Sequence, residues 1–98
     1  MLAEILDLLL APVERLLRRK RGTPERIAQF YKSAAWKRAR FEVLSKSPRC
    51  VYCGHSAKDG RRMNVDHIQP LSKRWDLRLD PRNLQTTCAS CNWGKGSR

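Results

Sequence analysis

The sequence predicts an α+β domain in which helices precede a small zinc-stabilised unit of short strands and a final helix. The length of 98 residues indicates one domain with an extra terminal segment. Apolar residues recur at helical spacing in the first half of the chain, whereas short β-branched runs occur in the second half. Two C-x-x-C pairs, Cys50/Cys53 and Cys88/Cys91, flank these runs. A chain this short buries a modest core and often needs a metal or disulfides, so the cysteines are the expected stabilising element.

Residues 1–22 are expected to form an amphipathic basic helix, separate from a main domain of residues 23–98. One apolar stripe at helical spacing consists of Leu2, Ile5, Leu6, Leu9, Val13, Leu16 and Leu17. Basic residues follow late in the helix, where they suit its dipole, and Pro12 should kink it. The stretch is too short and too charged to span a bilayer, and its basic cluster follows the apolar run, unlike a signal peptide. We expect packing on the domain or self-association, with a partner protein or a membrane surface as alternatives.

The next two helices are predicted from their caps. Thr23 can cap a helix, Pro24 suits its first position, and the short helix should cover residues 24–31. Ser33 then reads as the cap of a longer helix that ends near Lys46. Its inward residues are expected to be Ala35, Trp36, Ala39, Val43 and Leu44. We interpret Trp36 as a core anchor, and expect Lys37, Arg38 and Arg40 to face water or a phosphate backbone.

Two short strands and a helix are predicted downstream. The run from Met63 should be extended and end near Gln69, because Pro70 cannot donate to a sheet ladder. Neighbouring strand residues point to opposite faces, so Asp66 and His67 do not obviously share one pocket. Residues 84–87 form a plausible second strand, and Cys88 should open a helix that continues to Lys95.

The charge of the chain points to a polyanionic partner. The formal net charge is +12, from 21 Lys and Arg against 9 Asp and Glu. Nucleic acid is the natural partner of such a chain, because its phosphates supply salt-dependent affinity. An anionic membrane surface or ribosomal RNA fits the charge almost as well, so charge alone leaves the partner open.

The four cysteines predict a structural zinc site. In a secreted protein they could form two disulfides, although C-x-x-C partners make poor structural bridges. In a reducing compartment the two pairs would hold one tetrahedral Zn²⁺. Gly54 follows the second cysteine, as a turn around a metal-bound sulfur often requires. We expect zinc, and with it a reducing compartment such as the cytoplasm.

Taken in order, several stretches resemble the HNH nuclease motif with its zinc-binding cysteines. Residues 66–71, 83–85 and 88–96 carry the resemblance. Residues 30–36 and 50–54 also resemble the region that precedes the motif in small HNH endonucleases, particularly those from phages. The resemblance implies a ββα-metal fold, a divalent metal at the active site and hydrolysis of a DNA phosphodiester bond.

The same resemblance implies a role for each polar residue of the motif. His67 would be the general base that takes a proton from water, and Asn83 would hold the loop that aims its imidazole. Asp66 and Asn92 would bind the catalytic Mg²⁺ or Mn²⁺, while the four cysteines would bind structural zinc only. Many members have His where this sequence has Asn92, but the family also includes Asn there, and its neutral oxygen suits these hard ions.

Elementary chemistry supports these roles. A phosphodiester anion repels an attacking hydroxide, so a cation is needed, and neutral histidine can accept a proton from water near neutral pH. Basic residues expected to contact DNA are Lys37, Arg38, Arg40 and Lys95. We therefore expect an HNH endonuclease or nickase acting on double-stranded DNA. The alternatives are a zinc-dependent nucleic-acid-binding module that never cleaves, and a partner-docking subunit of a larger machine such as a phage packaging complex.

Overall fold

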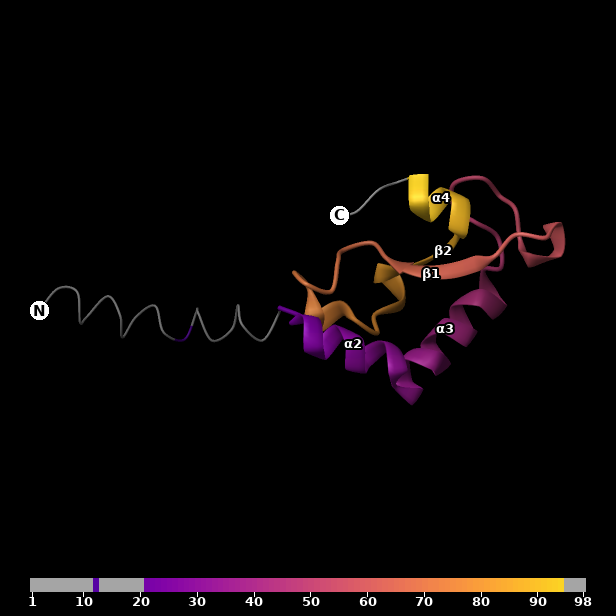
Figure 1. The fold of residues 1–98 in the computed structure, drawn as a ribbon. Helices are drawn as coiled ribbons and strands as arrows, with labels where there is room; N and C mark the ends of the chain where they lie inside the picture. The colour runs from indigo at the N-terminus through magenta and orange to yellow at the C-terminus, as the bar shows by residue number, and fades with distance from the viewer. Residues whose placement is uncertain (1–11, 13–20, 95–98) are drawn as a thin grey trace, which may run out of the picture.

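The computed structural model describes residue 12 and residues 21–94, and it confirms the predicted α+β class (Figure 1). The helix predicted over residues 1–22 falls almost entirely outside the described residues. Lys95 also lies outside them. No helix in the described part of the chain is both long and apolar enough to cross a bilayer. In chain order the elements are α2 (Pro24–Lys32), α3 (Ala34–Lys46), η1 (Ala57–Asp59), β1 (Met63–His67), η2 (Trp75–Leu77), η3 (Pro81–Asn83), β2 (Leu84–Cys88) and α4 (Ala89–Gly94).

The capping predictions for α2 and α3 are confirmed. The Thr23 hydroxyl accepts a hydrogen bond from the Arg26 amide at 3.2 Å, and Pro24 occupies the first turn. Ser33 ends α2, because its own amide donates to the Phe30 carbonyl. The Ser33 hydroxyl then accepts from the Trp36 amide at 3.1 Å, which starts α3. One serine therefore ends one helix and begins the next, which fixes the bend between them.

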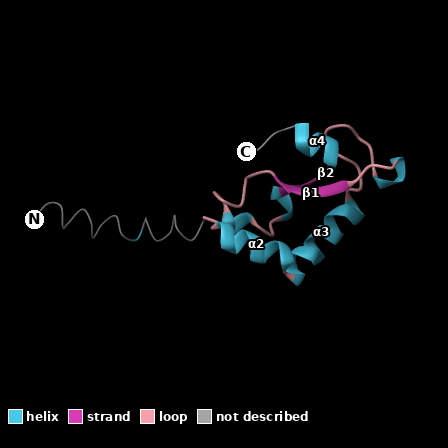
Figure 2. Ribbon diagram, viewed as in Figure 1, coloured by secondary structure: helices cyan, strands magenta, loops and turns pink. Residues whose placement is uncertain are grey.

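The sheet is an antiparallel hairpin of β1 and β2, with Met63 opposite Cys88 and His67 opposite Leu84 (Figure 2). Alternate residues of β1 are buried, as the period of a strand requires. The buried face packs against α2 and α3 and forms the main core, which consists of Phe30, Trp36, Val65, Leu71 and Leu84. The prediction that Trp36 anchors the core is confirmed, since it is 7% exposed.

The short helix α4 packs against both strands of the hairpin, and Figure 1 shows it on the side away from α3. Because β1 alternates, Asn64 and Asp66 lie on the face opposite to the core residues Val65 and His67. Strand, strand and helix thus follow one another in a ββα unit, with α2 and α3 supporting its other face.

Three local predictions differ from the structure. β1 ends at His67 instead of near Gln69, because the Ile68 and Gln69 amides donate to the backbone and side-chain oxygens of Asn83. Ala35 is exposed, since it lies one helical step away from the buried Trp36. Cys88 is the last residue of β2, and α4 begins one residue later, at Ala89.

The chain before α2 lies against the loop that follows β1. The Gly22 amide donates to the Leu71 carbonyl at 2.9 Å, and an added Cβ on Gly22 would lie 2.5 Å from that oxygen.

Candidate active site

The four cysteines converge on one point, as predicted. Their Sγ atoms all lie within 4.8 Å of one another, and the Sγ atoms of Cys53 and Cys88 are 3.6 Å apart. A disulfide requires about 2.05 Å, so this pair is not bonded. Zinc–thiolate bonds of about 2.3 Å place tetrahedral sulfurs about 3.8 Å apart, which the observed spacing fits.

The chemistry of these thiols also fits a bound cation. Burial by itself raises the pKa of Cys50, but hydrogen bonds from Cys88, Cys53 and Tyr52 lower it to about 6. Hydrogen bonding to Cys88, together with burial, raises the pKa of Cys91 to about 12. The thiols therefore cannot all ionise on their own account, whereas a divalent cation at their centre would stabilise four thiolates together.

The turn that carries the first two cysteines is built for this geometry. Gly54 has a φ of 77°, and its amide donates to the Cys50 carbonyl at 2.9 Å. The prediction of a tight turn at Gly54 is confirmed. The Cys50 amide donates in turn to the carbonyl of His55. This bond closes the turn over residues 50–55, which we call the cysteine knuckle.

His67 ends β1 with its imidazole held on two sides. Its Nε2 lies 3.0 Å from the Arg78 carbonyl oxygen. A carbonyl can only accept, so Nε2 carries the proton and the lone pair is on Nδ1. The ring stacks on Trp36, with centroids 5.1 Å apart and planes at 25°. Burial lowers the pKa of His67, although the bond to Arg78 raises it in part, so the imidazole is neutral near pH 7.

Asn83 joins two segments near His67: the residues that directly follow it and the segment whose carbonyl bonds its imidazole. Its side-chain oxygen accepts from the Gln69 amide at 2.7 Å, while Nδ2 donates to the carbonyls of Gln69 and Leu77 at 3.2 and 3.3 Å. Leu77 directly precedes Arg78, whose carbonyl bonds the imidazole. Asn83 is 5% exposed, so these bonds are shielded from water. They tie the loop between the strands into one conformation.

Asp66 lies on the other face of β1, as the alternation predicts, and it is held from the opposite strand. Gln85 is its register partner, and the Gln85 amide Nε2 donates to Asp66 Oδ2 at 3.3 Å and to Tyr52 Oη at 3.1 Å. Tyr52 belongs to the cysteine knuckle, between Cys50 and Cys53. A continuous polar link therefore runs from the thiol cluster to the Asp66 carboxylate.

The remaining candidates lie on helices. Asn92 is half-buried on α4, which packs on β1. Lys37 and Arg38 are exposed on α3. Arg40 is fixed to the hairpin, because its Nη2 donates to the Met63 carbonyl at 3.2 Å.

Residue-type reasoning missed Gln85, Tyr52 and Arg78. Gln85 pairs with Asp66 through the strand register, which no short turn fixes because residues 68–83 separate the two strands. The Arg78 contact is made by a backbone carbonyl, which no side-chain pattern can report.

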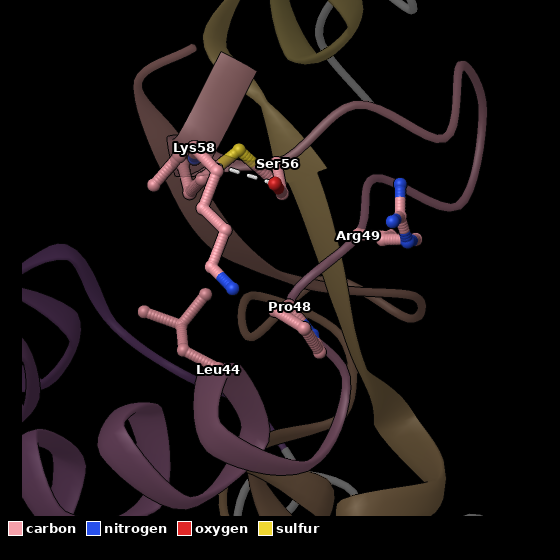
Figure 3. Close-up of a pocket in the computed structure, with 7 residues that line it drawn as sticks. Leu44, Pro48, Arg49, Ser56 and Lys58 are labelled. Carbon is pink, nitrogen blue, oxygen red and sulfur yellow. Dashed lines mark hydrogen bonds between the residues drawn. The ribbon is translucent and has the colours of Figure 1, made fainter. Parts of the chain in front are cut away.

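A cavity of about 290 Å³ lies beside η1, away from these residues (Figure 3). Leu44, Pro48 and Met63 give it an apolar wall, and the Lys58 side chain extends across it toward Leu44. Neither Asp66 nor His67 lines it. This cavity is therefore separate from the candidate active site.

The hairpin, the helix on its outer face and the four-thiol cluster together define the ββα-metal class of domain. A scan against protein-family models matches "HNH endonuclease" over residues 50–98. Among solved structures, the HNH endonuclease of the deep-sea thermophilic bacteriophage GVE2, crystallised with manganese ion, is 39% identical. The match covers 72% of this chain and 78% of that chain, with a TM-score of 0.62. A search of curated proteins found no match. The chain belongs to the HNH endonuclease family.

Proposed function

We propose that the protein is a metal-dependent endonuclease or nickase that hydrolyses phosphodiester bonds of double-stranded DNA. The observation that carries this proposal is the fixed tautomer of His67. Its Nε2–H is committed to the Arg78 carbonyl, and no described residue bonds Nδ1. Nδ1 is therefore available to accept a proton from water as that water attacks phosphorus and the bond to the leaving oxygen breaks.

The supports of His67 suit a general base. Stacking on Trp36 and the bond to Arg78 restrict ring rotation, and burial favours the neutral form that a base needs. Asn83 holds the Leu77–Arg78 segment, so we assign it the orienting role. Removal of a well-placed general base typically lowers a rate by about 10² to 10⁴.

The residues proposed for the catalytic metal supply hard oxygen donors. Asp66 has a carboxylate and Asn92 an amide oxygen, which suit Mg²⁺ or Mn²⁺. The Gln85 amide occupies Asp66 Oδ2, which orients the carboxylate on its face of β1. On the same face, the buried Thr87 hydroxyl lacks a partner among the described residues, so a water in this region would satisfy it. When bound, a divalent cation neutralises phosphate charge and stabilises the leaving oxygen.

Substrate binding is proposed to rest on the basic surface. Lys37 and Arg38 are exposed and would contact phosphates, and Arg40 and Lys95 are retained as candidate contacts. The formal net charge of +12 on the chain supports a polyanionic substrate. Zinc at the four cysteines would maintain the fold without entering the reaction.

Two further proposals concern the context of the domain. Residues 1–22 would form a helical segment separate from residues 23–98, available for self-association or a protein partner. Unpaired thiols in the cluster support a reducing compartment, the cytoplasm of a bacterial or phage-infected cell.

The test is cleavage of supercoiled plasmid with Mg²⁺ or Mn²⁺ by the wild type, His67→Ala and His55→Ala. His55 is the other of the two histidines in the chain and is exposed, so it is a matched control. We expect the wild type and His55→Ala to cut, and His67→Ala to lose at least about 100-fold in rate. Equal cutting by all three proteins would remove His67 from the mechanism. Tight binding without cutting by the wild type would instead favour a non-catalytic module.

A further inference from the structure

An exposed tryptophan lies beside the proposed metal-binding residue of α4. Trp93 is 86% exposed and directly follows Asn92, whereas Trp36 is 7% exposed and Trp75 is half-buried. With this exposure, the Trp93 side chain contributes little to the packing of residues 21–94. The Trp93 indole is therefore available for contact with a ligand.

The surroundings of Trp93 indicate the kind of ligand. The Ala89 amide at the start of α4 donates to the Arg62 carbonyl at 2.8 Å, so Arg61 and Arg62, both exposed, lie beside this helix. An exposed indole next to a proposed metal-binding residue, on a helix whose first residue bonds an arginine carbonyl, matches a nucleic acid: bases offer flat apolar faces and phosphates offer negative charge.

We infer that Trp93 is a DNA-contacting residue that stacks on an unstacked base near the cleaved phosphate, and this inference rests on the proposed function. Adjacent Cα atoms are about 3.8 Å apart, so an indole at position 93 reaches only a few base steps, of about 3.4 Å each, from a phosphate bound at Asn92. Aromatic–base stacking is favourable with every base, so Trp93 adds affinity without sequence preference.

This contact should distinguish intact from distorted DNA. In a perfect duplex a base must first be unstacked, and that cost offsets much of the gain from stacking on the indole. At a mismatch, a bulge or a single strand the base is already free. Trp93 should therefore favour DNA with a locally unpaired base.

The test measures DNA binding by zinc-loaded full-length protein without added Mg²⁺ or Mn²⁺, which separates binding from cleavage. Fluorescein-labelled probes are a perfect duplex, the same duplex with a central bulge, and the single strand. The proteins are wild type, Trp93→Ala, Trp93→Phe and Phe41→Ala. Phe41 is 71% exposed on α3, across the hairpin from α4, so it is the matched aromatic control. Zinc content and circular dichroism confirm that each variant is folded.

We expect Trp93→Ala to weaken binding of the bulged and single-stranded probes by about tenfold, which corresponds to about 1.4 kcal/mol. Loss on the perfect duplex should be smaller. Trp93→Phe should retain most of the affinity. Phe41 lies one helical turn from Lys37, so any loss in Phe41→Ala should be equal on the three probes. The bulged probe should also quench tryptophan emission more strongly in the wild type than in Trp93→Phe, because Trp36 is buried and Trp75 is half-buried.

Wild-type affinity of Trp93→Ala for all three probes, or unchanged quenching in Trp93→Phe, would overturn the inference. Those results, obtained with a wild type that binds and cuts DNA, would leave the proposed function intact. A wild type that neither binds nor cuts DNA would overturn both.

Discussion

The imidazole of His67 lies nearly parallel to the indole of Trp36, with ring centroids 5.1 Å apart. One residue ends β1 and the other belongs to the first turn of α3. Phe30 packs against both rings, at 5.4 Å from Trp36 and 6.0 Å from His67. The core that stabilises the domain and the support of the proposed base are therefore the same cluster.

Truncation of Trp36 should show this double role. Trp36→Ala is expected to lower the free energy of unfolding by about 3–5 kcal/mol, because it leaves a cavity in the core. Trp36→Phe should lose less stability and retain more cleavage. Urea unfolding followed by circular dichroism measures the first effect. Trp93→Ala, at an exposed tryptophan, is the control; a comparable loss there would contradict the assignment of Trp36 to the core.

Asn83 should be sensitive to a nearly isosteric change. Asn83→Asp keeps the acceptor for the Gln69 amide but places a carboxylate against the carbonyls of Gln69 and Leu77. We expect a loss of about 1–3 kcal/mol for buried groups left unsatisfied, and slower plasmid cutting as the Arg78 segment loosens. Thermal unfolding and cleavage rate measure the two effects. Asn64→Asp, on the outer face of β1, should change the unfolding temperature less.

Gln85 should control metal affinity. Gln85→Leu removes the hydrogen bond to Asp66 Oδ2, so the carboxylate loses its fixed orientation. Loss of such an outer hydrogen bond typically weakens metal binding by about 10- to 100-fold. Titration calorimetry with Mn²⁺ on zinc-loaded protein measures this directly. Tyr52→Phe, which removes only the far end of the link, should have a smaller effect; unchanged Mn²⁺ affinity in Gln85→Leu would exclude the orienting role.

The pH dependence of His67 has a definite sign. Burial lowers its pKa in the folded protein, so at low pH the unfolded chain binds the proton more readily. Burial of neutral His67 therefore contributes stability that is complete above the unfolded pKa of about 6.5. This contribution is lost as the pH falls through the lower pKa of the folded protein. Comparing unfolding temperatures of the wild type and His67→Gln from about pH 8 to pH 5 isolates this effect, because thiolate protonation is common to both. Cleavage should persist below about pH 6.5, because the lowered pKa keeps the His67 imidazole neutral there. A steeper loss of stability on acidification in His67→Gln would reverse the predicted sign.

The thiol cluster should bind about one zinc ion per chain. Cys88 is 1% exposed at the centre of the cluster, so Cys88→Ser should abolish tight zinc binding and leave the domain largely unfolded. Metal analysis and circular dichroism measure both effects, and a chelator should reproduce them in the wild type. Ser90→Ala, between Cys88 and Cys91, should bind zinc normally. A Cys88→Ser protein that folds and retains zinc would rule out this ligand set.

The sequence by itself determined the elements whose signals are local. Caps at Thr23 and Ser33 marked the helices, β-branched runs marked the strands, and the C-x-x-C spacing marked the thiol cluster. Strand alternation also placed Asp66 and His67 on opposite faces. Only the tertiary structure decided that Trp36 stacks on His67, that the Arg78 carbonyl fixes its tautomer and that Gln85 links Asp66 to the cysteine knuckle. These contacts join residues distant in sequence, and one uses a backbone group, so no residue type or spacing encodes them.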